Sequence, residues 1–152
     1  MPEGGSVSRS GFSAIVRALA LAALSTLGAC EADASKPVEP HWGKVPCGHC
    51  AMLVSTPRYA AQGVRASGER VFFDDVGCLV SFEHAQREPL RIAWAHDEAS
   101  GWHDMQTARF RSGESTPMDF GFAAVSSAEG ARITEVRGAI LAKLAHQEAL
   151  AP

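Results

Sequence analysis

The chain has 152 residues, of which 46% are hydrophobic, and its formal net charge is -3. This length suits one ordinary globular unit and is too short for two large cores. The mildly acidic balance offers no basic surface for nucleic acid, so no such partner is expected. The sequence contains no Ser-His-Asp order, no paired carboxylates and no glycine-rich phosphate loop, and it is therefore predicted not to be an enzyme.

Residues 1–29 have the layout of a secretory signal peptide. Arg9 and Arg17 precede an apolar run over 18–27, which is long enough for a signal core and too short to span a bilayer. The Leu-Gly-Ala-Cys at 27–30 resembles a bacterial lipobox, in which the cysteine is lipidated and becomes the new amino terminus. We therefore expect a lipoprotein anchored through Cys30 at the periplasmic or extracytoplasmic face of a membrane. The alternative is a plain signal peptide that leaves Cys30 free.

Residues 30–45 are predicted to be a flexible tether, because they are rich in Pro, Ala and acidic residues and have no apolar period. His41 and Trp42 lie near its end.

The six residues 47–52, Cys-Gly-His-Cys-Ala-Met, combine two thiols, an imidazole and a thioether. Thiolate and thioether sulfur select soft ions such as Cu(I), and thiolate with imidazole also suits zinc. A Cys-x-x-Cys pair can equally be a redox couple. Cys47, Cys50 and Cys78 remain after export, and three thiols cannot all pair within one chain in an oxidising compartment.

The next segment, 46–95, is predicted to be a ββαβ unit. Strands over 59–66 and 70–73 are joined by a compact turn at 67–69. Asp74 or Asp75 caps a helix that runs to about residue 87. Alternation over 90–94 indicates the third strand.

Residues 96–146 are predicted to repeat this order. A broken strand region covers 102–111, and a clearer strand covers 120–125. A helix capped by Ser126 or Ser127 reaches Val136 and ends at Gly138. Residues 139–143 form a last strand or continue as helix. The expected fold class is therefore α+β, with two tandem ββαβ units.

Each candidate residue outside the six-residue cluster has a second interpretation. Cys78 lies on the first turn of the predicted helix, where the dipole favours a thiolate, but most free cysteines are small buried hydrophobes. Met118 lies in the motif Thr-Pro-Met-Asp. Taken alone, such a methionine is more often a core residue than a metal ligand. The remaining histidines are most simply solvated ones. They are His84, His96, His103 and His146.

The surroundings of the Cys-x-x-Cys pair argue against two common classes. A thioredoxin-like pair opens a long helix after a strand, whereas here Pro46 precedes the pair and Pro57 interrupts any helix that starts there. Covalent haem attachment needs His at position 51, which is Ala51.

Taken in order, the motifs resemble those of the NosL family. They are Cys-x-x-Cys-x-Met at 47–52, Tyr-Ala-Ala-Gln at 59–62, Phe-Asp-Asp-Val-Gly-Cys at 73–78 and Thr-Pro-Met at 116–118, behind a lipobox. Members of this family are lipoproteins implicated in delivering copper to nitrous oxide reductase, and their fold is two tandem ββαβ units. The likeness covers about residues 46–144.

The resemblance implies a membrane-anchored Cu(I) metallochaperone. Its ligands would be Cys50, Met52 and Met118, with Cys47 and His49 and, as further candidates, Cys78 or His41. Its partners would be a copper-accepting protein such as nitrous oxide reductase and a membrane exporter.

This sequence departs from the family pattern at two positions. Ala51 and Asp119 stand where the family usually has Gly, and Gly reaches conformations that other residues adopt at a cost. Two rival functions stay open. One is a thiol-disulfide exchange protein using Cys47 and Cys50, and the other is a structural zinc lipoprotein using the three thiols and one histidine.

Overall fold

The computed structural model describes residues 33–150. The predicted signal peptide and Cys30 lie outside the described residues. Between residues 33 and 150 there are two α-helices, Val76–Gln86 (α2) and Ile133–Leu150 (α3). Neither combines the length and apolar character needed to cross a membrane.

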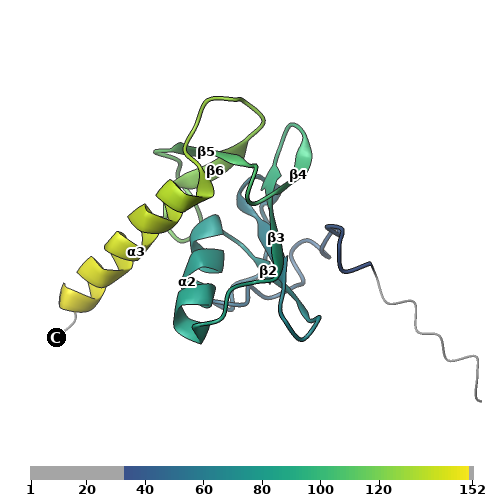
Figure 1. The fold of residues 1–152 in the computed structure, drawn as a ribbon, viewed down its shortest axis with the longest axis horizontal. Coiled ribbons are helices and arrows are strands. Elements are labelled where there is room, and N and C mark those ends of the chain that lie inside the picture. Colours follow the sequence, from purple (N-terminus) through teal and green to yellow (C-terminus); the bar gives the residue numbers. More distant parts are fainter. Residues whose placement is uncertain (1–32, 151–152) are drawn as a thin grey trace, which may run out of the picture. The chain divides into compact units, whose positions relative to one another are not determined.

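A four-stranded antiparallel sheet forms one layer of the fold (Figure 1). Its strand order is β2-β1-β3-β4. The strands are β1 (Ala61–Val64), β2 (Arg70–Phe73), β3 (Ile92–Asp97) and β4 (Gly101–Asp104). All four residues of β1 are buried because this strand is paired on both sides, with Ala61 opposite Phe73 and Ala95. The predicted hairpin is confirmed, but its first strand is shorter because Pro57–Tyr59 form a single 3-10 turn (η2).

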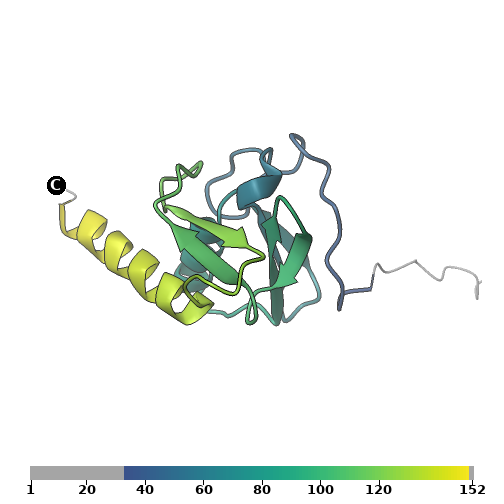
Figure 2. The same ribbon diagram turned by 90° about the horizontal axis from the view of Figure 1, so that it is seen from above.

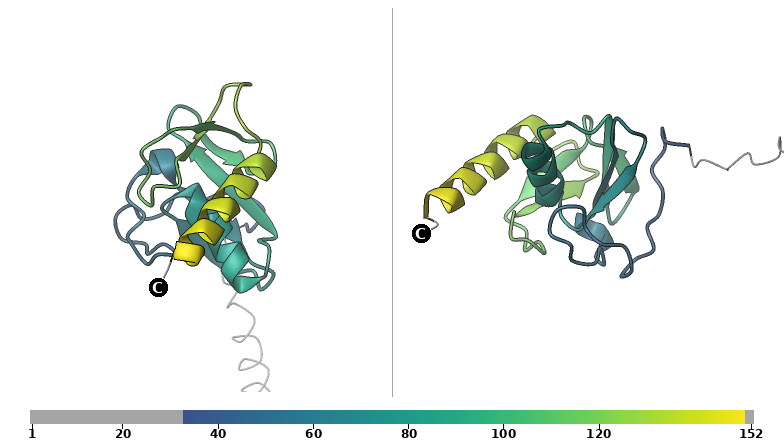
Figure 3. Two further views of the ribbon diagram at one scale, coloured as in Figure 1. Left: turned by 90° about the vertical axis from the view of Figure 1, so that its left-hand side faces the viewer. Right: turned by 90° about the horizontal axis from the view of Figure 1, so that it is seen from below.

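Helix α2 begins where the sequence predicts. Asp75 is extended (φ -151, ψ 142) and its side chain accepts a hydrogen bond from the amide of Gly77, as an N-cap does. The helix ends at Gln86, followed by Arg87 in the left-handed region. It packs against β1 and β2 on one side and α3 on the other, so Val76 to Glu83 are all buried (Figure 3).

The predicted broken strand region at 102–111 is divided between two sheets. Its first part is β4, which pairs with β3. Its second part is β5 (Arg109–Ser112), which pairs antiparallel with β6 (Phe122–Val125) in a separate two-stranded sheet beside β3 (Figure 2). The turn over 105–108 separates the two parts, with the amide of Ala108 bonded to the carbonyl of Asp104 at 2.8 Å.

The last helix differs from the prediction at both ends. It begins at Ile133 rather than after Ser126 or Ser127, continues through Gly138, and includes 139–143. The Glu135 carboxylate accepts a hydrogen bond from the amide of Arg132 at 2.8 Å, which is one half of a capping box. Ile133, Val136 and Ile140 lie on one buried stripe, and burial of this stripe outweighs the propensity cost of one exposed glycine.

The α+β class and the β1-β2-α2-β3 order of the first unit are confirmed. The second unit keeps β5, β6 and α3. Of the two alternatives for residues 139–143, the helix is confirmed and the last strand is wrong. One core serves both units, because Phe73 and Leu79 belong to the same buried cluster as Phe110 and Ile140.

The segment predicted as a tether lies against the sheet from Lys36 onward. The buried side chain of Gln62 donates to the carbonyl of Val38 at 2.9 Å and accepts from its amide at 3.1 Å. Arg70 donates to the carbonyl of Lys36 at 2.8 Å. The indole of Trp102 donates to Glu39 at 2.8 Å. These contacts satisfy polar groups of the sheet, so this part of 30–45 is packed rather than free.

Candidate metal centre

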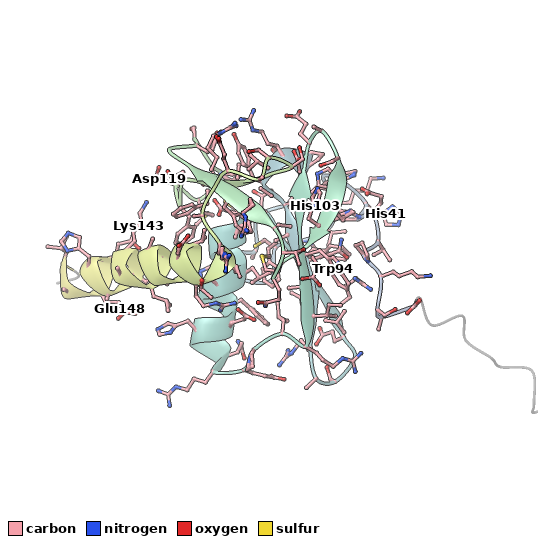
Figure 4. All side chains as sticks on the ribbon, turned by 45° about the horizontal axis from the view of Figure 1, so that its top comes forward. His41, Trp94, His103, Asp119, Lys143 and Glu148 are labelled. Carbon is pink, nitrogen blue, oxygen red and sulfur yellow. The ribbon has the colours of Figure 1, made fainter. Side chains whose placement is uncertain are left out.

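Three cysteines from two distant segments meet at the start of α2. The Sγ atoms of Cys47, Cys50 and Cys78 all lie within 4.8 Å of one another. Cys78 Sγ is 3.9 Å from Cys50 Sγ. Cys47 is 3% exposed and Cys78 is 0% exposed, while Cys50 is only partly buried. Sulfur atoms are visible in Figure 4 beside α2, between this helix and the sheet. Three thiols this close can bind one soft ion together.

The loop that carries Cys47 and Cys50 is fixed to the exposed edge of β2. The amide of Gly48 donates to the carbonyl of Phe72 at 2.8 Å. A Cβ atom at residue 48 would lie 2.3 Å from Val71 Cγ1, so only glycine allows this approach. Within the loop, the amide of Cys47 donates to the carbonyl of Met52 at 2.7 Å. The loop is therefore a closed turn rather than the start of a helix.

Both departures from the family pattern have left-handed backbones. Ala51 has a φ of 62° and Asp119 a φ of 57°, a region that glycine enters without a steric penalty. The amide of Ala51 donates to the carbonyl of Cys47 at 3.0 Å, so its conformation closes the turn between the two thiols. Lys143 of α3 donates to the carbonyl of Asp119 and to its carboxylate at 3.1 Å (Figure 4). At both positions the chain therefore keeps a glycine-like backbone, although alanine and aspartate adopt it at a cost.

The three thiols share their protons unequally. The pKa of Cys47 is lowered to about 5, because the Cys78 thiol donates a hydrogen bond to it and the amides of Cys50, Asp74 and His49 stabilise its thiolate against the effect of burial. Donating that hydrogen bond raises the pKa of Cys78, and burial and the Cys47 thiolate raise it further. Burial raises the pKa of Cys50. The hydrogen bond from Cys78 therefore favours the thiolate at Cys47 over a thiolate at the other two cysteines.

One solved structure with a similar fold is the crystal structure of the copper chaperone NosL from Shewanella denitrificans. The two structures superpose with a TM-score of 0.51 over 70% of this chain and 87% of that chain, at 15% sequence identity. The fold of this chain is NosL-like. No protein-family model and no curated protein matches the sequence.

Two further predicted ligands, Met52 and Met118, carry thioethers on either side of the thiol cluster in the sequence, and they differ in burial in this NosL-like fold. Met52 comes directly after the turn and is 50% exposed. Met118 is partly buried against the core cluster that contains Cys47 and Cys78. Its amide donates to the carboxylate of Asp75 at 3.4 Å.

The two histidines named as ligand candidates do not join the thiols. His49 and His41 are exposed, and His41 lies on the side of the molecule away from α3 (Figure 4). Cys78, which the sequence offered only as a further candidate, is a full member of the cluster. The sequence signal for its role was its position on the first turn of a capped helix, because such a position holds the thiol at a fixed place beside the helix N-terminus.

Proposed function

We propose that this protein is a membrane-anchored Cu(I) carrier that delivers copper to an exported copper enzyme. The observation that supports it best is the meeting of three thiol sulfurs within 4.8 Å. The NosL-like fold, shared with a copper chaperone, points the same way. Nitrous oxide reductase as the acceptor, an exporter as the donor and the lipid anchor on Cys30 rest on the sequence motifs.

The burial of the thiols suits a carrier. Cys47 and Cys78 hold the ion from the protein interior, and the partly exposed Cys50 faces the side from which an acceptor approaches. Release of Cu(I) then proceeds by stepwise ligand replacement. A ligand of the acceptor first replaces Cys50, and the sulfurs of Cys47 and Cys78 release the ion afterwards. Met52 and Met118 add thioether sulfur that suits Cu(I) and adds no charge.

A structural zinc site is the weaker interpretation of the same sulfurs. Such sites use four ligands, and the group of His, Cys, Asp and Glu donors found among residues 33–150 supplies three, Cys47, Cys50 and Cys78. A low coordination number suits Cu(I) better.

Thiol-disulfide exchange through Cys47 and Cys50 is also weaker. An exchange protein needs an exposed nucleophile at the start of a helix, whereas the low-pKa thiol here, Cys47, is 3% exposed in a turn.

The test is an anaerobic Cu(I) titration of the mature chain against a colorimetric Cu(I) chelator. We expect one tightly bound Cu(I) per chain, weaker binding in Cys50→Ser, Cys78→Ser and Met118→Ala, and unchanged binding in Met105→Leu. Met105 is a matched control because it is a buried core methionine. The carrier function would be ruled out if the chain did not bind Cu(I). It would also be ruled out if the chain bound Zn(II) more tightly and unfolded when zinc is chelated.

A further inference from the structure

Asp75 is a buried carboxylate whose two oxygens have different partners. Its exposed fraction is 0%. Oδ1 accepts from the amide of Gly77 at 2.6 Å, which caps α2. Oδ2 accepts from the amide of Met118 at 3.4 Å, 43 residues further along the chain. One side chain therefore joins the turn that carries Cys78 to the loop that carries Met118.

The preceding residue makes the equivalent connection on the other side. Asp74 Oδ1 accepts from the amide of Ser55 at 3.2 Å, just beyond Met52. Because the backbone is extended at Asp75, successive side chains point to opposite sides. The two aspartates thus bond to the two different segments that supply sulfur.

Helix capping alone does not account for a carboxylate at position 75. Burial of a charge is costly, and serine or asparagine caps a helix about as well as aspartate. A cap uses one acceptor atom, whereas both oxygens of Asp75 accept, one from Gly77 and the other from Met118. The second carboxylate oxygen of Asp75 is needed to accept the hydrogen bond from the amide of Met118.

Hydrogen bonds within the loop that carries Met118 fix its own shape. The amide of Asp119 donates to the carbonyl of Thr116 at 3.0 Å, which closes the Thr-Pro-Met turn. The hydroxyl of Thr116 accepts from the amide of Gly121 at 3.1 Å. Asp75 is thus bonded to a turn that is already closed, and its bond fixes where the whole turn sits.

We propose that Asp75 is a positioning residue that holds the Met118 thioether in place at the copper site. This inference rests on the proposed Cu(I) function. Asp75 does not touch the ion; it acts through the backbone of Met118, in the way that outer partners orient metal ligands.

A double-mutant cycle with Asp75→Asn and Met118→Ala tests the inference. Asparagine still caps α2, but it has one acceptor oxygen, so either Gly77 or Met118 loses its partner. We expect Asp75→Asn and Met118→Ala each to weaken Cu(I) binding about 10-fold, as loss of an outer partner typically does. The double variant should bind within about 2-fold of Met118→Ala, because Asp75 has nothing left to position. Independent effects, which multiply to about 100-fold, would overturn the proposal.

A second measurement separates positioning from general damage to the fold. Copper K-edge absorption should count one sulfur fewer around Cu(I) in Asp75→Asn, as in Met118→Ala, and no fewer in Asp104→Asn. Asp104 is a matched control because it is exposed and its carboxylate accepts from the amide of Gln106, at 2.8 Å, far from the thiols in the sequence. If Asp75→Asn is unstable, Asp75→Ser provides a cap too short to reach Met118.

The outcomes keep the two proposals apart. Failure of the unmutated chain to bind Cu(I) would overturn the carrier function. Tight binding by the unmutated chain, with an unchanged sulfur count in Asp75→Asn, would overturn the positioning role alone.

Discussion

Phe120 lies so close to Gly77 that a Cβ atom at residue 77 would be 2.0 Å from Phe120 Cγ. Gly77 directly precedes Cys78, and Phe120 lies two residues after Met118. The absence of a side chain at residue 77 therefore lets the Met118 loop touch the helical turn that carries a thiol. This contact and the bond from Asp75 hold the same loop.

The substitution Gly77→Ala is expected to destabilise the protein by about 1–3 kcal/mol, because overpacking forces Phe120 to move. It should also weaken Cu(I) binding, since the Met118 loop moves with Phe120. Urea unfolding and Cu(I) competition measure the two effects. The control is Gly138→Ala, an exposed helical position with no atom within 4 Å, which should instead stabilise by about 1 kcal/mol. Equal effects of the two substitutions would contradict this account of Gly77.

The substitution Ala51→Gly is expected to stabilise the apoprotein by up to about 1 kcal/mol. The φ of 62° costs alanine more than glycine, and the greater freedom of glycine in the unfolded chain returns part of that gain. Thermal unfolding measures the change. Ala85→Gly, at an exposed position inside α2, should cost about 1 kcal/mol. A loss of stability in both variants would show that the turn at Ala51 is not strained.

His96 is expected to make stability depend on pH below about 6.5, the ordinary pKa of histidine. Its ring lies edge-on to Trp42 and Trp102, with centroids 5.9 and 4.9 Å away, and burial lowers its pKa although Glu39 and Asp97 oppose the shift. The unfolded chain therefore takes up a proton first as the pH falls. The free energy of unfolding should fall from about pH 6.5 downward, through the lowered pKa of the folded state.

The check is chemical denaturation of the unmutated chain and of His96→Phe at a series of pH values. Phenylalanine keeps an aromatic edge against the two indoles and cannot titrate. The difference between the two stability curves isolates His96 from the other histidines. If the curves run parallel from about pH 7.5 to about pH 5, His96 does not contribute to the pH dependence.

Oxidation is expected to abolish Cu(I) binding. Oxidised glutathione would convert two of the three neighbouring thiols into a disulfide and would itself be reduced to two thiols, which leaves one protein thiol free. Cu(I) affinity should fall by more than about 100-fold, because loss of even an outer partner costs about 10–100-fold. Thiol counting, mass spectrometry and Cu(I) competition on the same sample provide the check. An oxidised chain that still binds Cu(I) tightly would show that Cys47, Cys50 and Cys78 are not the main ligands.

Local signals in the sequence predicted much of the fold. The hairpin of β1 and β2, the cap at Asp75 and the α+β class arise from patterns that act within a few residues. The start and end of α3 could not be predicted in this way. Ser126, Ser127 and Gly138 are ordinary start and stop signals, but burial of the stripe at Ile133, Val136 and Ile140 overrides them.

Some features of the candidate site could likewise be predicted from short-range patterns, and others could not. The sequence by itself determined the spacing of Cys47 and Cys50 in a turn that cannot start a long helix, and the place of Cys78 on the first turn of α2. Only the tertiary structure decided that Cys78 joins the other two thiols and that the Met118 loop rests on the same helical turn. The reason is physical. Packing of Phe120 on Gly77 and partly buried hydrogen bonds to Asp74 and Asp75 bring these residues together, and no short-range pattern in the sequence indicates such contacts between distant segments.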